Sequence, residues 1–143
     1  MNGKSKIALW ASVAIGLTAI ALGGMKTSTA QAGTVMHVTD LAISKHFVGF
    51  RGQPPAFVAV MYIRDQSGNP VAGAVVTGDF GGCFTKPGAS ARTDRNGQAK
   101  VIGDKVDCAT TGPCDVTFVV TDVVKSGAAW NGVSATASSP GCR

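Results

Sequence analysis

Glutamate is absent from this sequence, and all eight acidic residues are aspartates. Histidine is also rare, because the chain holds only His37 and His46. Neither a G-x-S-x-G nucleophile elbow nor an H-E-x-x-H zinc motif occurs. The sequence therefore lacks the usual patterns of a general base, a nucleophile or a catalytic metal, and we expect a protein without catalytic residues or cofactors.

Metal-binding patterns are missing as well. The four cysteines do not form a C-x-x-C pair, and both histidines lie far from them in the sequence. Asp94 and Asn96 resemble a fragment of a calcium loop, but the other ligands of such a loop are absent, so a plain turn is expected there. We expect no metal site.

No hydrophobic run in the chain is long enough to make a typical membrane-spanning helix. The longest covers residues 7–22, which is 16 residues, whereas a spanning helix needs ~20. Lys4 and Lys6 precede the run, and Ala30-Gln31-Ala32 follows it. This order is typical of a secretory signal peptide over residues 1–32, with an uncleaved anchor as the alternative. It predicts an extracellular or periplasmic domain over residues 33–143.

The excess of positive charge becomes small once the predicted signal peptide is removed. Lys4, Lys6 and Lys26 leave with it, so the net charge falls from +5 to +2. The remaining basic residues are scattered along the chain. We therefore expect neither nucleic acid nor, after cleavage, a membrane as a partner.

Alternation of apolar residues is clearest over residues 57–80. Phe57, Ala59, Met61 and Ile63 share one face of a predicted strand, and a Gly-Asn-Pro turn at residues 67–70 follows. Ala74, Val76 and Phe80 alternate in the same way in the next segment. Two alternating runs around such a turn predict a β-hairpin.

Short strands recur along the rest of the domain, and we find no helical stretch. The segments over residues 81–91 and 125–132 are interpreted as a loop and a turn. About seven strands at regular spacing predict an all-β, two-sheet sandwich. The other strands are expected at residues 35–43, 98–105, 116–124 and 133–138.

Four segments carry a resemblance to a known family: MHVTDL at 36–41, VAVMYIRDQSGNPVAGAVVTGDF at 58–80, TDRNGQAKV at 93–101 and TFVVTDVVKSG at 117–127. In this order they resemble the bacterial immunoglobulin-like modules appended to secreted subtilisin-type proteases, which are related to the immunoglobulin-like repeats of adhesins. The resemblance implies an immunoglobulin-like sandwich, secretion and an accessory role. This chain differs in its four cysteines and in an aromatic first connection.

An even number of cysteines in an exported chain predicts two disulfides. The topology implied by the resemblance brings all four to one end of the sandwich. We favour Cys108–Cys114 with Cys83–Cys142, because the first pair closes a hairpin loop and the second ties a strand to the C-terminal tail. Cys83–Cys114 with Cys108–Cys142 remains the alternative.

The aromatic connection is the first candidate contact surface. It contains His46, Phe47, Phe50 and Arg51, and the same topology places it at the cysteine end. Loops held on a rigid scaffold often carry binding residues. The alternative is that Phe47 and Phe50 fold back as a lid over the core.

The second candidate is the outer face of the strand at residues 57–65, which carries Val58, Val60 and Tyr62. Two apolar faces on one strand indicate cover by a partner or another subunit. Strand propensity alone is the alternative explanation. Trp130 is expected to plug the other end of the sandwich rather than to bind a ligand.

These features favour a secreted, non-catalytic binding or accessory module that contacts a surface polymer or a secreted protein. One alternative is a structural subunit that self-associates through strand faces or edges. The other is an inhibitor of a secreted protease that presents a disulfide-held loop.

Overall fold

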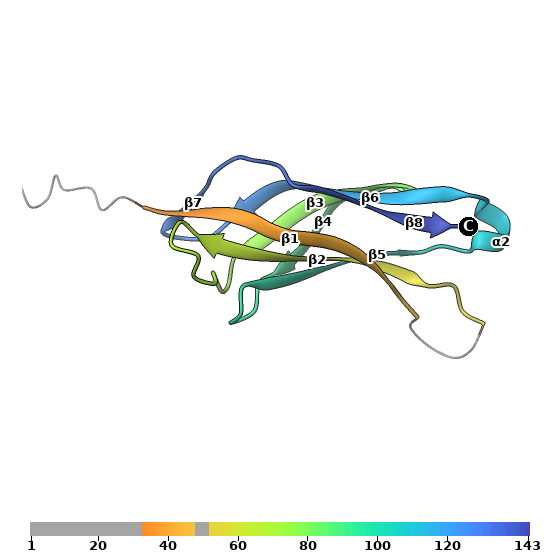
Figure 1. Cartoon of the computed structure of the whole chain (residues 1–143), viewed down its shortest axis with the longest axis horizontal. Coiled ribbons are helices and arrows are strands. Elements are labelled where there is room, and N and C mark those ends of the chain that lie inside the picture. The colour runs from red at the N-terminus through yellow and green to blue at the C-terminus, as the bar shows by residue number, and fades with distance from the viewer. Residues whose placement is uncertain (1–32, 48–51) are drawn as a thin grey trace, which may run out of the picture. The chain divides into compact units, whose positions relative to one another are not determined.

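The computed structural model describes residues 33–47 and 52–143 (Figure 1). The predicted signal peptide, residues 1–32, lies outside the described residues. These described residues form eight strands and one short helix: β1 (Thr34–His46), β2 (Ala56–Asp65), β3 (Val75–Gly82), β4 (Lys86–Arg92), β5 (Gln98–Lys105), α2 (Cys108–Thr111), β6 (Cys114–Val124), β7 (Ala128–Trp130) and β8 (Thr136–Cys142). No helix among the described residues combines the length and the apolar character needed to cross a bilayer.

Two four-stranded sheets make up the domain, with strand orders β5-β2-β1-β7 and β4-β3-β6-β8. They lie face to face as two layers (Figure 1). β1, β2 and β5 share one sheet, and β3, β6 and β8 share the other, as strands A, B, E and C, F, G do in immunoglobulin domains. The predicted all-β immunoglobulin-like sandwich is thus confirmed, with eight strands instead of about seven.

The core lies between the two sheets and is filled by the alternating residues of their inner faces. The predicted inward face of β2 is fully buried, and so are Val116, Phe118 and Val120 of β6. Phe118 packs on Phe80 of β3, with ring centroids 4.6 Å apart. Period-2 alternation therefore identifies the inner faces correctly, because successive side chains of a strand point to opposite sides of the sheet.

The predicted hairpin over residues 57–80 is wrong. β2 pairs with β1 and β5, whereas β3 pairs with β4 and β6, so the two segments belong to different sheets. The tight turn does form, but the ladder beside it ends at a bridge between Arg64 and Pro70. Both segments have an apolar face, and those faces bury each other more completely across the sandwich than side by side in one sheet.

Three elements lie where the sequence predicts turns or loops. β4, with the sequence KPGASAR, is an edge strand, where a proline is tolerated because one side of the ladder needs no N–H donor. β7 pairs in parallel with the start of β1. α2 is a single turn capped by the Asp107 carboxylate, which accepts a hydrogen bond from Ala109 N at 3.0 Å. The last strand, β8, begins three residues later than predicted.

A bulge in β1 keeps both of its halves facing the core. Thr39 lies opposite Tyr62 and Ala42 opposite Val60, so two residues of β1 oppose one of β2. Asp40, within the bulge, is the one non-glycine residue of the described chain with positive φ, at 52°. The extra residue moves the inward-facing positions of β1 from even to odd residue numbers. Val38 before the bulge and Ile43 after it therefore both pack on the core.

Two disulfides close one end of the sandwich, Cys83–Cys114 and Cys108–Cys142. The favoured pairing was wrong and the alternative pairing is the one found. Cys83 N donates to the Asp115 carbonyl oxygen at 3.0 Å, which places Cys83 beside Cys114 at the start of β6. The turn of α2 meanwhile places Cys108 against the end of β8. Two disulfides indicate that the domain matures in an oxidising compartment.

Candidate functional site

Val58, Val60 and Tyr62 do lie on the outer face of the sheet β5-β2-β1-β7, opposite to the face that covers the core. On β1 their neighbours are Ser44, Ala42 and Thr39, and on β5 they are Ile102, Lys100 and Gln98. This outer face therefore has an apolar centre along β2, with polar and basic residues on the strands beside it.

At the disulfide end of this face, β2 is buried on both sides. Val58 is only 8 % exposed although its side chain points away from the core, and Ala56 is buried too. Together with His46, Lys100 and Ile102 they line a hollow of about 220 Å³, which we call the β2 hollow. Its walls come from three strands of one sheet, so the backbone ladder holds them in place.

The β2 hollow combines apolar walls with one lysine and one histidine side chain. Ala56, Val58 and Ile102 form the apolar part, and Ile102 is 63 % exposed. Lys100 and His46 supply the polar groups, and no carboxylate is among its lining residues. Within the described chain, which holds every aspartate, Lys100 forms no salt bridge. Its charge is thus available to an incoming anion.

Val58, Val60 and Tyr62 form an apolar strip along the outer face of β2, and Tyr62 lies at the end of this strip away from the β2 hollow. Its hydroxyl accepts a hydrogen bond from Gln98 Nε2 at 2.7 Å, and the Arg64 guanidinium lies 5.7 Å from the ring centroid. These contacts use the polar edge and one face of the ring. Tyr62 therefore extends the apolar strip as a fixed side chain.

Phe47 follows β1 directly and is 78 % exposed, so the prediction of a core lid is wrong for this residue. It lines a second hollow of about 360 Å³ together with residues 52–55 and 106–109. Phe47 thus lies at the cysteine end, as the sequence predicts, beside Cys108 and Ala109, whereas Cys83 is not among the residues that line this hollow. Phe50 and Arg51 lie outside the described residues.

The lid at this end is Phe84, which sequence reasoning missed. Its ring lies 5.3 Å from that of Phe80 and 6.2 Å from that of Phe57, measured between centroids. A Cβ on Gly103 would come within 2.7 Å of the Phe84 ring, so the glycine leaves room for it. The position of an aromatic residue directly after Cys83 could have indicated this lid, but residues 81–91 were interpreted as a loop.

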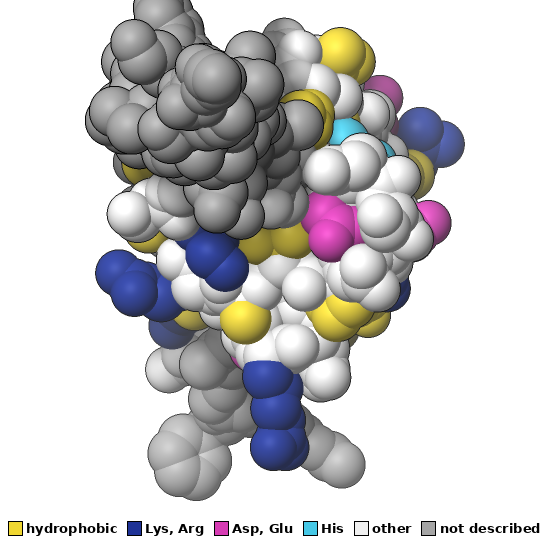
Figure 2. Space-filling view, turned by 90° about the vertical axis from the view of Figure 1, so that its left-hand side faces the viewer, with side chains coloured by type: hydrophobic (Ala, Val, Ile, Leu, Met, Phe, Trp, Pro, Cys, Tyr) yellow, Lys and Arg dark blue, Asp and Glu magenta, His cyan; other side chains and the backbone are white. Residues whose placement is uncertain are grey.

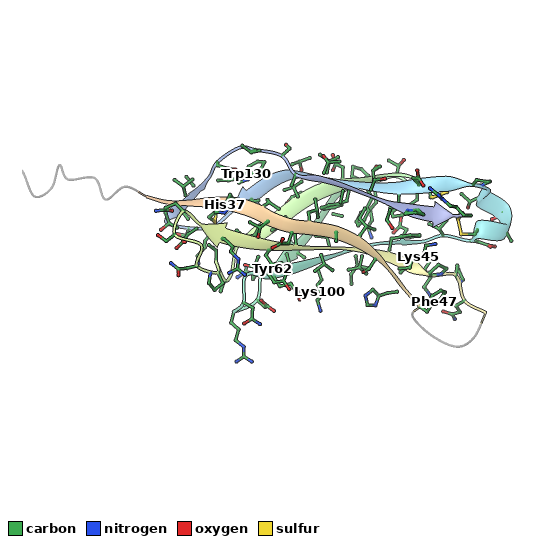
Figure 3. All side chains as sticks on the ribbon, viewed as in Figure 1. His37, Lys45, Phe47, Tyr62, Lys100 and Trp130 are labelled. Carbon is green, nitrogen blue, oxygen red and sulfur yellow. A yellow bond between two sulfur atoms is a disulfide. The ribbon has the colours of Figure 1, made fainter. Side chains whose placement is uncertain are left out.

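Trp130 lies at the opposite end from the disulfides (Figure 3). It packs against the core while remaining partly exposed, as expected of a plug. Its indole Nε1 is buried without a hydrogen-bond partner in the described part of the chain. Trp130 therefore covers one end of the core and is not part of the candidate site.

The ionisable groups do not converge on one point. His37 lies near the start of β1 and His46 at its end, and neither forms a salt bridge with an aspartate of the described chain. The sulfurs of Cys83, Cys114 and Cys142 lie within 4.8 Å of one another, but each belongs to a disulfide and offers no thiolate to a metal.

Two aspartates organise turns instead. Asp94 Oδ1 accepts from Asn96 N at 2.8 Å and Gln98 N at 3.0 Å, which is the plain turn expected from the sequence. Asp65 accepts from the backbone N–H groups of Asn69 and Ser67, both at 2.8 Å. The Asn69 bond is the main cause that lowers the pKa of Asp65, with the charge of His37 adding to it.

Charged side chains are dispersed on the end of the domain seen in Figure 2. Lys and Arg side chains stand at separate places there, with uncharged surface between them. This view agrees with the scattered distribution in the sequence. Comparisons with protein-family models, with curated proteins and with solved structures find no match to this chain.

Proposed function

We propose that this chain is a secreted, non-catalytic immunoglobulin-like module that binds another protein through the disulfide end of the sheet β5-β2-β1-β7. The observation that carries the proposal is the β2 hollow, which is lined by the exposed Ile102 and lies near the second hollow with the exposed Phe47. We call Phe47 together with the lining residues of the β2 hollow the contact surface.

Apolar groups that remain exposed on a rigid scaffold support this function. Phe47 and Ile102 of the contact surface are exposed, so a bound partner would bury them, and that burial favours association. The sheet and the two disulfides hold the surface in one shape, so binding orders few side chains. The same features are found at protein interfaces, where a few apolar anchors contribute most of the affinity.

The absence of catalytic activity is supported by the chemistry of the described side chains. The two histidines lie at different ends of β1, and the cysteines are joined in disulfides. Secretion is supported by the signal-peptide pattern of residues 1–32 and by the oxidising environment that the disulfides indicate. The resemblance to immunoglobulin-like modules of secreted proteases agrees with an accessory role.

One observation favours a structural subunit as the second candidate. β7 covers the edge of β1 only at residues 34–36, so residues 38–46 have no second ladder neighbour among the described strands. An open edge can pair with another chain. However, the bulge at Asp40 interrupts this edge, and such bulges hinder the pairing of strand edges. We therefore rank this function below binding through the contact surface.

A matched pair of variants tests the proposal. Phe47→Ser/Ile102→Ser removes two exposed apolar side chains of the contact surface, and Val124→Ser/Val133→Ser removes two exposed ones elsewhere. Immobilised exported protein is incubated with culture supernatant, and the retained proteins are identified by mass spectrometry. We expect the first variant to lose the partner retained by the wild type and the second to keep it. Equal retention by both variants would place the binding surface elsewhere.

A further inference from the structure

We propose that the β2 hollow receives a single apolar side chain from an acidic protein partner, and that a carboxylate next to this side chain pairs with Lys100. This inference rests on the proposed function and adds the chemistry of the partner. It follows from the size of the hollow, from the charges around it and from the effect of those charges on self-association.

The volume of the hollow suits a single side chain of a protein partner better than a whole drug-sized molecule. Sites for drug-sized ligands usually occupy roughly 300–1,000 Å³ and enclose most of the ligand. The β2 hollow has about 220 Å³ and is open on the outer face of the sheet. A leucine or phenylalanine side chain presented by another protein can fill such a space while its backbone stays outside.

The positive charges around the hollow favour a partner that carries acidic residues. Lys100 lines the hollow, and Lys105 lies opposite Ala56 in the β2–β5 ladder, so two lysines belong to this part of the sheet. The nearest carboxylate along β5, that of Asp104, is held by Lys86 at 3.0 Å. An incoming carboxylate therefore meets a positive environment without competition from an aspartate lining the hollow, and complementary charge also raises the rate of association.

The same charges disfavour a second copy of this chain as the occupant. Two copies that met through the same face would bring Lys100 and Lys105 of each near those of the other. The chain has no glutamate, and its predicted secreted form carries a net charge of +2. Like charges placed across an interface oppose association. A heterologous acidic protein fits the hollow better.

Nuclear magnetic resonance with defined peptides tests this inference. The exported protein, labelled with ¹⁵N, is titrated with an acidic peptide in which leucines alternate with aspartates. One control peptide has lysine in place of aspartate, and another has serine in place of leucine. We expect the acidic leucine peptide to shift the amide signals of Val58, Lys100 and Ile102, and both controls to bind at least tenfold more weakly.

Two charge variants sharpen the test. Lys100→Gln should weaken binding of the acidic leucine peptide by about two- to fivefold, as for the loss of one exposed ion pair. Arg95→Gln removes the same charge from the turn between β4 and β5 and should leave the affinity unchanged. Added salt should reduce the difference between Lys100→Gln and the wild type, because salt screens exposed charges.

Several results would overturn the inference. The lysine peptide could bind as well as the acidic one, or decanoate alone could bind as tightly as the peptide, which would indicate a small amphiphile. Shifts at the hollow that depend on protein concentration without any peptide would indicate a second copy. If no probe shifts these signals while the supernatant partner is still retained through Phe47, the inference fails and the proposed function stands.

Discussion

His46 at the end of β1 lies directly opposite Ala56 at the start of β2 in their antiparallel ladder. Through this pairing His46 lines the β2 hollow with Val58, while the next residue, Phe47, lines the second hollow. The aromatic connection and the outer face of β2, which the sequence presents as alternative surfaces, therefore meet at the same end of one sheet.

Phe118→Ala should lower the free energy of unfolding by about 3–5 kcal/mol, because it removes a fully buried ring from the centre of the core. Asn69→Ala, in an exposed turn, should cost far less, since it removes one side-chain hydrogen bond to Asp65 of 3.2 Å. Urea unfolding of both variants measures the difference. Similar losses would mean that the inner face of β6 is assigned incorrectly.

The disulfides predict both a mass and a connectivity. Non-reduced exported protein should be four hydrogens lighter than its reduced form, and peptide mapping should recover Cys83 linked to Cys114. Cys83→Ala/Cys114→Ala should cost about 2–5 kcal/mol of stability, because the bond closes a loop between residues 31 positions apart. Free thiols in the exported protein, or a peptide linking Cys108 to Cys114, would contradict this structure.

The sequence predicts which faces are buried, but not which strands are neighbours. Alternation alone identifies the inward residues of β2, β3 and β6, because burial depends only on the side of the strand. It does not distinguish a hairpin from a crossing between sheets, so the pairing of residues 57–80 was wrong. β4 was missed because KPGASAR has no β-branched or aromatic residue, and its place comes from pairing with β3.

The candidate site was predictable only in parts, for the same reason. Val58, Val60 and Tyr62 follow from alternation along one strand. Lys100 and Ile102 join them through the register between β2 and β5, which a single sequence does not reveal. The disulfide pairing depended on the one-turn helix α2, and four residues closed by an aspartate cap give too little helical pattern to be recognised.

Asp65 should make stability depend on pH in the acid range. Hydrogen bonds from Asn69 hold the pKa of Asp65 below its ordinary value of 3.8 in the folded protein. The charged carboxylate therefore stabilises the fold above this value, and the contribution is lost as the pH falls through the lower, folded-state pKa. Asp65→Asn should flatten the stability curve below about pH 4 in unfolding experiments.

Asp122→Asn is the matched control, because the Asp122 carboxylate accepts no hydrogen bond from the described residues. Asp122→Asn should leave the dependence of stability on pH in the acid range close to that of the wild type. If both variants flatten the curve equally, the acid sensitivity reflects the overall charge and not the turn at Asp65.

Phe47 and Phe84 should respond oppositely to substitution, although both lie at the disulfide end. Phe84 packs on Phe57 and Phe80, so Phe84→Ser should lower the free energy of unfolding by about 2–4 kcal/mol. Phe47 is 78 % exposed, and Phe47→Ser should change stability by no more than about 0.5 kcal/mol. Thermal and urea unfolding of the two variants provides the measurement.

The two variants also separate folding from binding. Because Phe47 belongs to the contact surface and contributes little to the core, Phe47→Ser should weaken retention of the supernatant partner while the melting temperature stays constant. Phe84→Ser should lower the melting temperature but retain the partner at temperatures where the domain remains folded. A large loss of stability in Phe47→Ser, with the partner still retained, would show that this ring covers the core in solution and that the β2 hollow alone carries the contact.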